Sequence, residues 1–340
     1  MKAVVYSEYG SPDVLQVREV EKPVPGDNEV LIKIHATTVT AGDWRALTLK
    51  LPGGFGPVGR LIFGVRRPRQ PVLGTELAGE VESVGNEVSR FKAGDQVFAF
   101  TGARMGSHAE YRCVPEDGAI ALKPPNLSYG EAAALSFGGT TALDFFRRGN
   151  LRSGEKVLVN GASGGVGTAA VQIARHFGAE VTGVTSAANI ELVRSLGAQH
   201  VIDYTHEDFT TNGETYDVIV DTAGTAPYSR SKNSLKTGGR LLLVLGNLGD
   251  LLTAPLISMA SDKKIVAGPA AERLDDLHFL AELAEAGEYT PVVGRTYSLE
   301  QIAEAHRYVD TGRKRGDVVI SVHNSGDYSN RPADKYTHTS

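Results

Sequence analysis

The segment KVLVNGASGGVG, residues 156–167, decides the fold of this 340-residue chain. Its first five residues form an apolar, β-branched run typical of a buried strand, and the apolar spacing after it predicts a helix over 165–176. Three of its glycines suit three tasks: turning the chain, letting a diphosphate approach the backbone, and packing the helix on the strand. Free N–H groups at the helix start then face a phosphate. The expected phosphate-loop residues are Gly161, Ala162, Ser163, Gly164, Gly165 and Val166.

Strands alternate with helices around this segment, which favours the phosphate loop over a glycine-rich turn without a ligand. Helical spacing occupies 190–196 and 274–286. Apolar runs predict five further strands, at 181–185, 200–203, 217–221, 239–245 and 264–267. Six strands with helical crossovers predict an α/β fold whose sheet is doubly wound and parallel, of the Rossmann type.

The first 120 residues have a different pattern, with short β-branched runs bounded by Gly, Pro, Asn and Asp. They predict a mostly β module with strands at 2–6, 29–36, 78–84 and 96–100. Between Arg45 and Gln70 the chain is rich in Gly, Pro and Arg, and so long a loop in a compact domain is usually functional or mobile. The arginines of this segment, at positions 60, 66, 67 and 69, are interpreted as a solvated surface.

Composition narrows the class of protein. The formal net charge is −5, which argues against nucleic acid or an anionic membrane as the main partner. The single cysteine, Cys113, excludes an intramolecular disulfide and a cysteine-based structural zinc site. The N-terminus shows no apolar signal region, and the longest apolar stretch, 241–257, is too interrupted for a membrane span. We therefore expect a cytoplasmic protein that acts on a small molecule.

The residues after the second strand of the sheet bear on the cofactor. That strand ends Val184-Thr185-Ser186, and no carboxylate follows until Glu191. NAD-specific sites usually place Asp or Glu here against the ribose 2′-hydroxyl, whereas a 2′-phosphate would meet hydroxyls rather than a like charge. We expect NADPH, with NADH as the alternative, and Tyr204 on the same side. Ser186 also suits the cap of the next helix, which is compatible with either cofactor.

Several motifs spread along nearly the whole chain: GSPDVL at 10–15, VLGTELAG at 72–79, FGGTTA at 137–142, the phosphate loop, and YSL at 297–299. Together they resemble the medium-chain dehydrogenase/reductase superfamily, in its zinc-independent quinone oxidoreductase-like (zeta-crystallin-like) branch. The resemblance implies a Rossmann domain at 125–269 and a GroES-like, mostly β catalytic domain at 1–124 and 270–340. The polar composition of 322–340 predicts a disordered tail. It also implies a homodimer joined at Rossmann-sheet edges, for which 240–245 is the expected strand.

The resemblance further identifies where alcohol dehydrogenases hold a catalytic zinc. The three ligand positions correspond here to Thr40, Thr75 and Phe137, none of which supplies the thiolate or imidazole that zinc needs. The hydroxyl that relays the alcohol proton in those enzymes falls at Gly42, which has no side chain. The nine histidines are scattered without paired ligand spacing. We therefore expect no metal site and no zinc.

Without a Lewis acid, the feasible acceptors are those that take hydride readily, namely quinones and activated alkenes such as α,β-unsaturated carbonyl compounds. Many relatives in the branch carry Asn where this chain has Thr40. The Thr40 hydroxyl either donates to a substrate oxygen or only caps backbone groups at a strand end. Trp44, the only tryptophan, either lines the substrate slot or packs in the core. Thr40 and Trp44 are the expected catalytic-site residues.

Cofactor contacts carry over from the resemblance position by position. Thr141 matches the threonine that holds the nicotinamide carboxamide, and residues 162–166 match the diphosphate loop. Ser186 and Tyr204 match adenosine-side contacts, and Asn189 stands where a lysine often meets the 2′-phosphate, so that ionic contact is lost. Ligands of such sheets bind beyond the carboxyl ends of strands. The remaining expected neighbours are therefore Ala223, Gly224, Leu245 and Gly246.

These features predict a zinc-independent, NADPH-dependent oxidoreductase that reduces quinones or activated alkenes by hydride transfer. The sparse set of acid–base residues leaves two alternatives open. One is a catalytically weak NADPH-binding redox sensor or binding protein, and the other is an alcohol dehydrogenase-like enzyme that would carry stoichiometric zinc.

Overall fold

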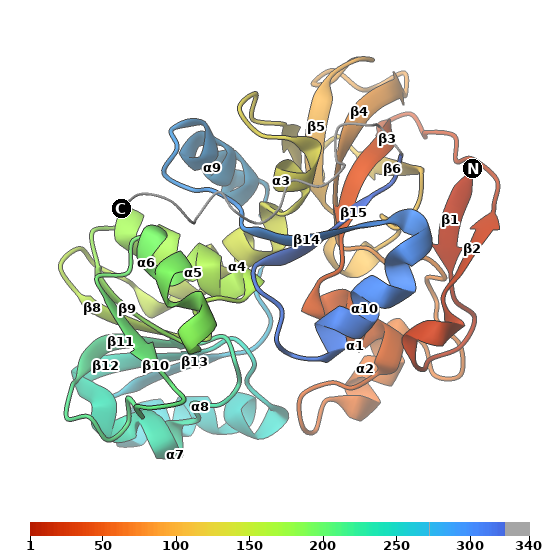
Figure 1. Cartoon of the computed structure of the whole chain (residues 1–340). Helices are drawn as coiled ribbons and strands as arrows, with labels where there is room; N and C mark the ends of the chain where they lie inside the picture. Colours follow the sequence, from red (N-terminus) through yellow and green to blue (C-terminus); the bar gives the residue numbers. More distant parts are fainter. Residues whose placement is uncertain (272, 324–340) are drawn as a thin grey trace. The chain divides into compact units, whose positions relative to one another are not determined.

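The computed structural model describes residues 1–271 and 273–323, which form two compact units (Figure 1). Residues 1–51, 56–137 and 273–323 make up the first unit, and residues 52–55 and 138–271 make up the second. The domain limits expected from the sequence, 1–124, 125–269 and 270–340, remain a prediction. Most of the expected tail, 322–340, lies outside the described residues. Val322 is described and is buried, with its N–H donating to the His35 carbonyl.

The second unit is built on a six-stranded parallel sheet, which confirms the predicted doubly wound arrangement. The strand order is β10-β9-β8-β11-β12-β13, so the direction of winding reverses between β8 and β11. The strands are β8 (Lys156–Asn160), β9 (Glu180–Thr185), β10 (His200–Asp203), β11 (Tyr216–Asp221), β12 (Leu235–Leu243) and β13 (Lys264–Ala267). Val157, Leu158 and Val159 are fully buried, as expected for a strand covered on both faces.

Helices cover this sheet. α5 (Gly165–His176) packs on β8 and β9, α6 (Ile190–Ser195) packs on β9 and β10, and α8 (Leu248–Ala260) packs against β13. The remaining helices of this part of the chain are α4 (Ser136–Gly149) and the short α7 (Tyr228–Ser231). Single 3₁₀ turns occur along the chain at 12–14, 102–104, 187–189, 232–234 and 299–301.

The first unit is built on a seven-stranded sheet, in the order β14-β15-β3-β4-β5-β7 with β6 also pairing with β3. Its strands are β3 (Glu29–Thr38), β4 (Glu76–Val84), β5 (Gln96–Phe100), β6 (Tyr111–Pro115), β7 (Ile120–Leu122), β14 (Val293–Ser298) and β15 (Asp317–Ser321). A separate ribbon pairs β1 (Lys2–Val5) with β2 (Gln16–Glu19). Because β15 pairs with β3, both ends of the chain contribute to one sheet.

The helices of the first unit are α1 (Ala41–Thr48), α2 (Gly56–Phe63), α3 (Tyr129–Ala133), α9 (Leu274–Glu285) and α10 (Ile302–Asp310). The predicted helix at 274–286 is therefore confirmed within a few residues. One apolar core, which includes Ile32, Leu77 and Ile320, holds the sheet against α1 and α10. None of the helices in the described ranges is long and apolar enough to span a bilayer.

Two expectations about elements are wrong. Most of the strand expected to join a dimer, 240–245, belongs to β12, which ends at Leu243, lies between β11 and β13 and uses its backbone hydrogen bonds on both sides. The edges of this sheet are β10 and β13, and the homodimer itself stays a prediction. The segment 45–70, expected as a loop, contains α2. Pro57 stands in the first turn of that helix, where a missing N–H costs nothing.

Candidate active site

The phosphate loop joins β8 to α5, and two of its glycines are required by the fold. Gly161 adopts φ +84°, in the left-handed region, and a Cβ there would lie 2.7 Å from Thr222 Oγ1. A Cβ on Gly167 would lie 2.0 Å from the Gly161 carbonyl oxygen, so only glycine lets α5 approach this closely. The predicted sharp turn and the predicted close packing are both confirmed.

The fold of the described residues does not require a glycine at position 164. Its backbone is extended (φ −80°, ψ 172°), and the nearest atom to a Cβ placed there is the Gly161 oxygen at 3.7 Å, an ordinary contact. Among the described residues other than its two chain neighbours, only the Gly161 oxygen lies within 4 Å of that Cβ position. No described residue accepts a hydrogen bond from the N–H of Ser163, Gly165 or Val166, and no side chain caps α5. A helix start whose amides have no acceptor among the described residues fits the diphosphate of a nucleotide.

Hydroxyl and amide groups gather where β9 ends. Thr185 Oγ1 donates to Ser163 Oγ at 2.9 Å, and Asn189 Nδ2 donates to Ser163 Oγ at 3.4 Å and to Ser186 Oγ at 3.2 Å. The Ser186 side chain makes no helix-cap hydrogen bond. Glu191, the first acid after the strand, is exposed and held in an ion pair. The structure thus brings three expected cofactor residues, Ser163, Ser186 and Asn189, into a neutral cluster that does not repel an anion.

The loop after β11 is fixed by a residue that sequence reasoning missed. The Asp221 carboxylate is buried and accepts hydrogen bonds from Asn160 Nδ2 at 2.9 Å, from Gly224 N at 2.9 Å and from Ala226 N at 2.8 Å. Ala223 and Gly224 are exposed beyond that strand end. An acid that directly follows the apolar run 218–220 was the signal that could have identified this role.

The other expected cofactor residues lie on separate elements of the same unit. Tyr204 is 63% exposed, and its N–H donates to the Thr185 carbonyl at 3.0 Å, which places it at the end of β9. Leu245 and Gly246 follow β12 and are half-buried. Thr141 is nearly buried in α4, a helix that reaches α5 where a Cβ on Gly138 would lie 2.8 Å from the Gly165 oxygen.

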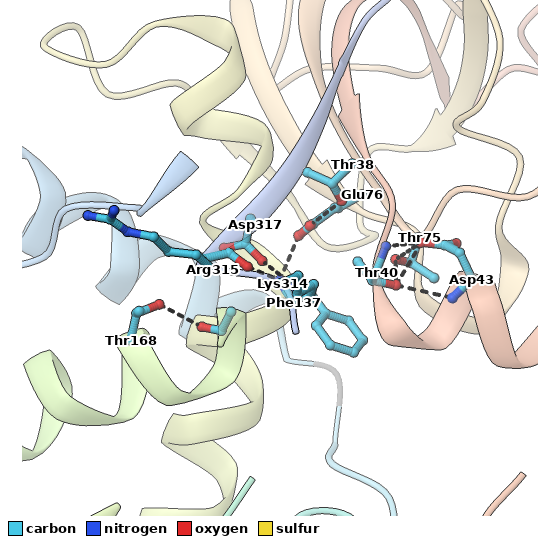
Figure 2. A network of polar contacts seen from close by, with 12 residues as sticks. Thr38, Thr40, Asp43, Thr75, Glu76, Phe137, Thr168, Lys314, Arg315 and Asp317 are labelled. Atoms are coloured by element: carbon cyan, nitrogen blue, oxygen red, sulfur yellow. Dashed lines mark hydrogen bonds and ion pairs between the residues drawn. The ribbon is translucent and has the colours of Figure 1, made fainter. Parts of the chain in front are cut away.

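In the first unit, the start of α1 meets the start of β4. Thr40 Oγ1 and Thr75 Oγ1 lie 3.3 Å apart, and the Asp43 carboxyl group accepts from Thr40 Oγ1 at 2.6 Å (Figure 2). Phe137 is close by, since a Cβ on Gly42 would lie 3.3 Å from Thr40 Oγ1 and 3.4 Å from Phe137 Cε2. The fold therefore brings together the three positions that correspond to zinc ligands in alcohol dehydrogenases.

The chemistry of these three positions does not fit zinc. They present two hydroxyl groups and a phenyl ring, with no thiolate or imidazole. The nearby Asp43 carboxyl group is already engaged by Thr40 and by Gly74 N at 3.0 Å. Across the described ranges, no group of three His, Cys, Asp or Glu side chains is arranged to hold a metal ion.

The contacts of Thr40 are those of a helix cap. Thr40 and Asp43 form a capping box at the start of α1, in which Asp43 N donates to Thr40 Oγ1 at 3.1 Å and Thr40 N donates back to the carboxyl group. The Thr40 hydroxyl proton is thus committed to Asp43. Thr75 has longer contacts, 3.3 Å to Thr40 and 3.5 Å to Asp43, so its O–H can turn more freely. Trp44 is half-buried and packs against the apolar core of its unit.

Glu76 is a second buried acid beside these groups. It is fully buried at the start of β4, where it accepts from Thr38 Oγ1 at 2.5 Å and from Phe137 N at 2.6 Å (Figure 2). Burial, aided by the nearby Asp317, raises the pKa of Glu76 to about 8. In the sequence, Glu76 is part of the motif at 72–79, and no role was predicted for it. A charged residue at the start of an apolar strand could have indicated a buried acid.

The raised pKa of Glu76 predicts a pH-dependent stability. The pKa in the fold is about 8 against 4.5 for an exposed glutamate, so the folded chain holds a proton that the unfolded chain releases. This stabilising contribution is fully present below pH 4.5 and is lost as the pH rises through about 8. We expect the unfolding free energy of the natural chain to fall by roughly 2–4 kcal/mol more than that of Glu76→Gln between about pH 5 and pH 9.

Urea unfolding at the two pH values, followed by the fluorescence of Trp44, measures this difference in the unit that contains Glu76. The glutamine keeps an oxygen that accepts a hydrogen bond but does not titrate. Glu82→Gln, at an exposed ion pair on the same strand, is the control and should run parallel to the natural chain. If the unfolding free energy falls by the same amount in the natural chain and in Glu76→Gln, Glu76 does not hold a proton in the folded chain.

Comparisons with known proteins agree with this geometry. Residues 26–124 match the alcohol dehydrogenase GroES-like domain, and residues 196–320 match the zinc-binding dehydrogenase family. The 2-methylene-furan-3-one reductase of Solanum lycopersicum is 34% identical over 332 residues, 94% of this chain and 79% of that protein. The chloroplastic NADPH-dependent alkenal/one oxidoreductase of Arabidopsis thaliana is 32% identical over 332 residues, again 94% of this chain and 79% of that protein.

A solved structure is similar over almost its whole length. The quinone oxidoreductase from Coxiella burnetii superposes with a TM-score of 0.83 at 27% identity, over 95% of this chain and 99% of that chain. The chain belongs to the medium-chain dehydrogenase/reductase superfamily, in its quinone oxidoreductase-like branch, a family of NAD(P)H-dependent oxidoreductases. One matching family is described as zinc-binding. In this chain, Thr40, Thr75 and Phe137 are not suitable zinc ligands.

Proposed function

We propose that this chain uses NADPH to reduce quinones or α,β-unsaturated carbonyl compounds. The observation that carries the proposal is the meeting of Thr40, Thr75 and Phe137, which offers hydroxyl groups but no metal ligand. An unactivated carbonyl needs a Lewis acid to accept hydride easily, whereas quinones and enones accept it without one. The names of the tomato, Arabidopsis and Coxiella relatives support the same substrate classes.

The second unit offers the groups that would hold the cofactor. The amides of Ser163, Gly165 and Val166, which have no acceptor among the described residues, would bind the diphosphate, and Ser186 with Asn189 would meet the 2′-phosphate. Tyr204, Ala223, Leu245, Gly246 and Thr141 are the proposed adenosine and nicotinamide neighbours. Bound NADPH supplies the hydride, and the protein supplies binding, orientation and exclusion of water.

The first unit offers the groups that would meet the substrate. Thr40 and Asp43 hold each other in the capping box, and this pair positions Thr75. The freer O–H of Thr75 would donate to the substrate oxygen, which gains negative charge when hydride adds to the conjugated carbon. Trp44 is the proposed aromatic wall of the substrate slot. Its partly exposed ring leaves that role available alongside its packing against the core.

A turnover assay tests the function. NADPH consumption is followed with a benzoquinone, an α,β-unsaturated aldehyde and a saturated ketone, each with and without a metal chelator. We expect turnover of the first two acceptors, none of the ketone, and no effect of the chelator. Tight NADPH binding without turnover of any acceptor would support a redox sensor instead. Chelator-sensitive oxidation of an alcohol would support an alcohol dehydrogenase.

The cofactor preference gives a separate prediction. Replacing Ser186 with aspartate places a carboxylate beside Asn189, against the expected 2′-phosphate. We expect the Kd for NADPH to rise roughly 30-fold, because like charges about 4 Å apart near a protein surface repel by a few kcal/mol. The Kd for NADH should stay the same or fall, because a carboxylate can accept a hydrogen bond from a ribose 2′-hydroxyl.

Fluorescence titration with both cofactors measures the two constants. Ser229→Asp is the matched control, since Ser229 is exposed on α7 of the same unit and receives the same change in charge. NADPH binding that is unchanged in Ser186→Asp would place the adenosine end elsewhere.

A further inference from the structure

Helix α2 turns its apolar side toward solvent. Val58, Leu61 and Ile62 lie along one face of this helix and are exposed by 43%, 65% and 53%, and Val65, two residues beyond the end of the helix, is exposed by 60%. The opposite side is buried at Gly59, where a Cβ would lie 1.9 Å from Leu51 Cδ1. Helices of soluble domains usually bury their apolar face. We call Val58, Leu61, Ile62 and Val65 the apolar stripe.

The segment around this stripe is strongly basic. Between Asp43 and Glu76 the chain carries six Lys and Arg residues and no Asp or Glu, although the whole chain has a net charge of −5. Within the described part of the chain, no carboxylate forms an ion pair with any arginine of this segment. Four arginines of this segment are exposed, and we call them the arginine cluster: Arg60, Arg66, Arg67 and Arg69.

The stripe and the cluster are held in place by the first unit. Tyr9 Oη donates to the Gly64 carbonyl at 2.9 Å, and Arg69 N donates to the Phe63 carbonyl at 2.8 Å. Phe63 also packs against the core of that unit. The apolar side chains and the arginines therefore come from one anchored segment.

We propose that the apolar stripe and the arginine cluster form a docking surface for an anionic phospholipid bilayer. A bilayer supplies both partners at once, because anionic headgroups lie directly over acyl chains. An acidic protein surface would match the arginines but not the four apolar side chains among them. The negative net charge of the chain argued against a membrane partner. The segment between Asp43 and Glu76 nevertheless has a local excess of positive charge, which the net charge does not show. Lipid-soluble quinones would make such docking useful to the proposed function, but the docking does not depend on it.

Vesicle sedimentation with the full-length protein tests the proposal without any activity measurement. We expect binding to vesicles of phosphatidylcholine with phosphatidylglycerol, and binding to pure phosphatidylcholine weaker by at least about tenfold. Raising the salt concentration should release the protein. The triple variant Arg66→Gln, Arg67→Gln, Arg69→Gln should lose roughly 100-fold in affinity, at about fivefold per basic residue near an anionic surface. The double variant Leu61→Ser, Ile62→Ser should lose at least about tenfold.

Two matched controls separate this surface from general effects. Leu252→Ser with Leu256→Ser changes equally exposed leucines on α8, a helix whose only charged residue is Asp250. Lys232→Gln, Arg273→Gln and Arg313→Gln removes the same charge from other exposed sites. Both controls should bind like the natural chain. All these positions are exposed, so unchanged thermal unfolding should confirm intact folding.

Three results would overturn the proposal. These are absence of binding to anionic vesicles, equal binding to neutral and anionic vesicles, and anionic binding that survives in both test variants. If light scattering shows that Leu61→Ser with Ile62→Ser converts a dimer to a monomer, the stripe is an interface between copies of the chain instead.

Discussion

Replacing Gly164 with alanine should weaken NADPH binding by at least about 30-fold while leaving the fold intact. The Cβ would stand at the phosphate loop, between the proposed diphosphate position and the amides that are proposed to bind it. Losing one charge-assisted hydrogen bond costs about 2 kcal/mol, which corresponds to that factor. The backbone of Gly164 is extended and the new atom meets only an ordinary contact at 3.7 Å, so the melting temperature should not change.

Gly167→Ala is the contrasting variant for this measurement. Its Cβ would lie 2.0 Å from the Gly161 oxygen, so α5 must move away from the loop. We expect destabilisation by about 3 kcal/mol in addition to lost binding. Isothermal titration with NADPH and thermal unfolding of both variants separate a binding loss from a folding loss. If Gly164→Ala binds NADPH as tightly as the natural chain, the diphosphate does not lie on this loop.

Replacing Asp43 with alanine should cost about 4 kcal/mol of stability. Asp43 is fully buried and accepts from Thr40 N at 2.8 Å, from Thr40 Oγ1 at 2.6 Å and from Gly74 N at 3.0 Å. Alanine would leave two backbone N–H groups and a hydroxyl buried without an acceptor, at about 1–3 kcal/mol each. Trp44 is the neighbouring residue and the only tryptophan, so its fluorescence in urea reports unfolding at this place.

Asp13→Ala is the matched control for Asp43. Asp13 is exposed and pairs with Arg307 at the surface, where solvent screening leaves such a pair little effect on stability. Asp43→Asn should lie between the two, because the amide keeps one accepting oxygen. A cost for Asp43→Ala no larger than that of Asp13→Ala would show that the capping box does not hold the site together.

The phosphate loop was predictable because its constraints are local. A positive φ at Gly161 and the approach of Gly167 to the Gly161 carbonyl both arise within seven consecutive residues. The strand pattern before and after the loop was equally readable, because each strand of a covered parallel sheet is continuously apolar. The six predicted strands are therefore confirmed, even though β12 begins and ends a few residues earlier than expected.

Other features depend on contacts between distant parts of the chain. Thr40 and Thr75 are 35 residues apart, and only the family resemblance indicated that they would meet. The interior position of β12 follows from the strand order, which no local pattern encodes. The commitment of the Thr40 hydroxyl to Asp43 required the geometry of the capping box. Helix α2 was missed because Gly56, Pro57 and Gly59 stand in its first half, although its apolar spacing was helical.

The pairing of β3 with β15 also sets the order in which a nascent chain can fold. Thr38 finds its partner Val319 only after almost the whole polypeptide has left the ribosome, whereas residues 138–271 emerge together and can fold first. Until then the 36–38 end of β3, which β6 does not cover, carries an open edge that invites pairing with other chains. A premature stop upstream of Asp317 should therefore yield an aggregating product rather than a smaller working enzyme.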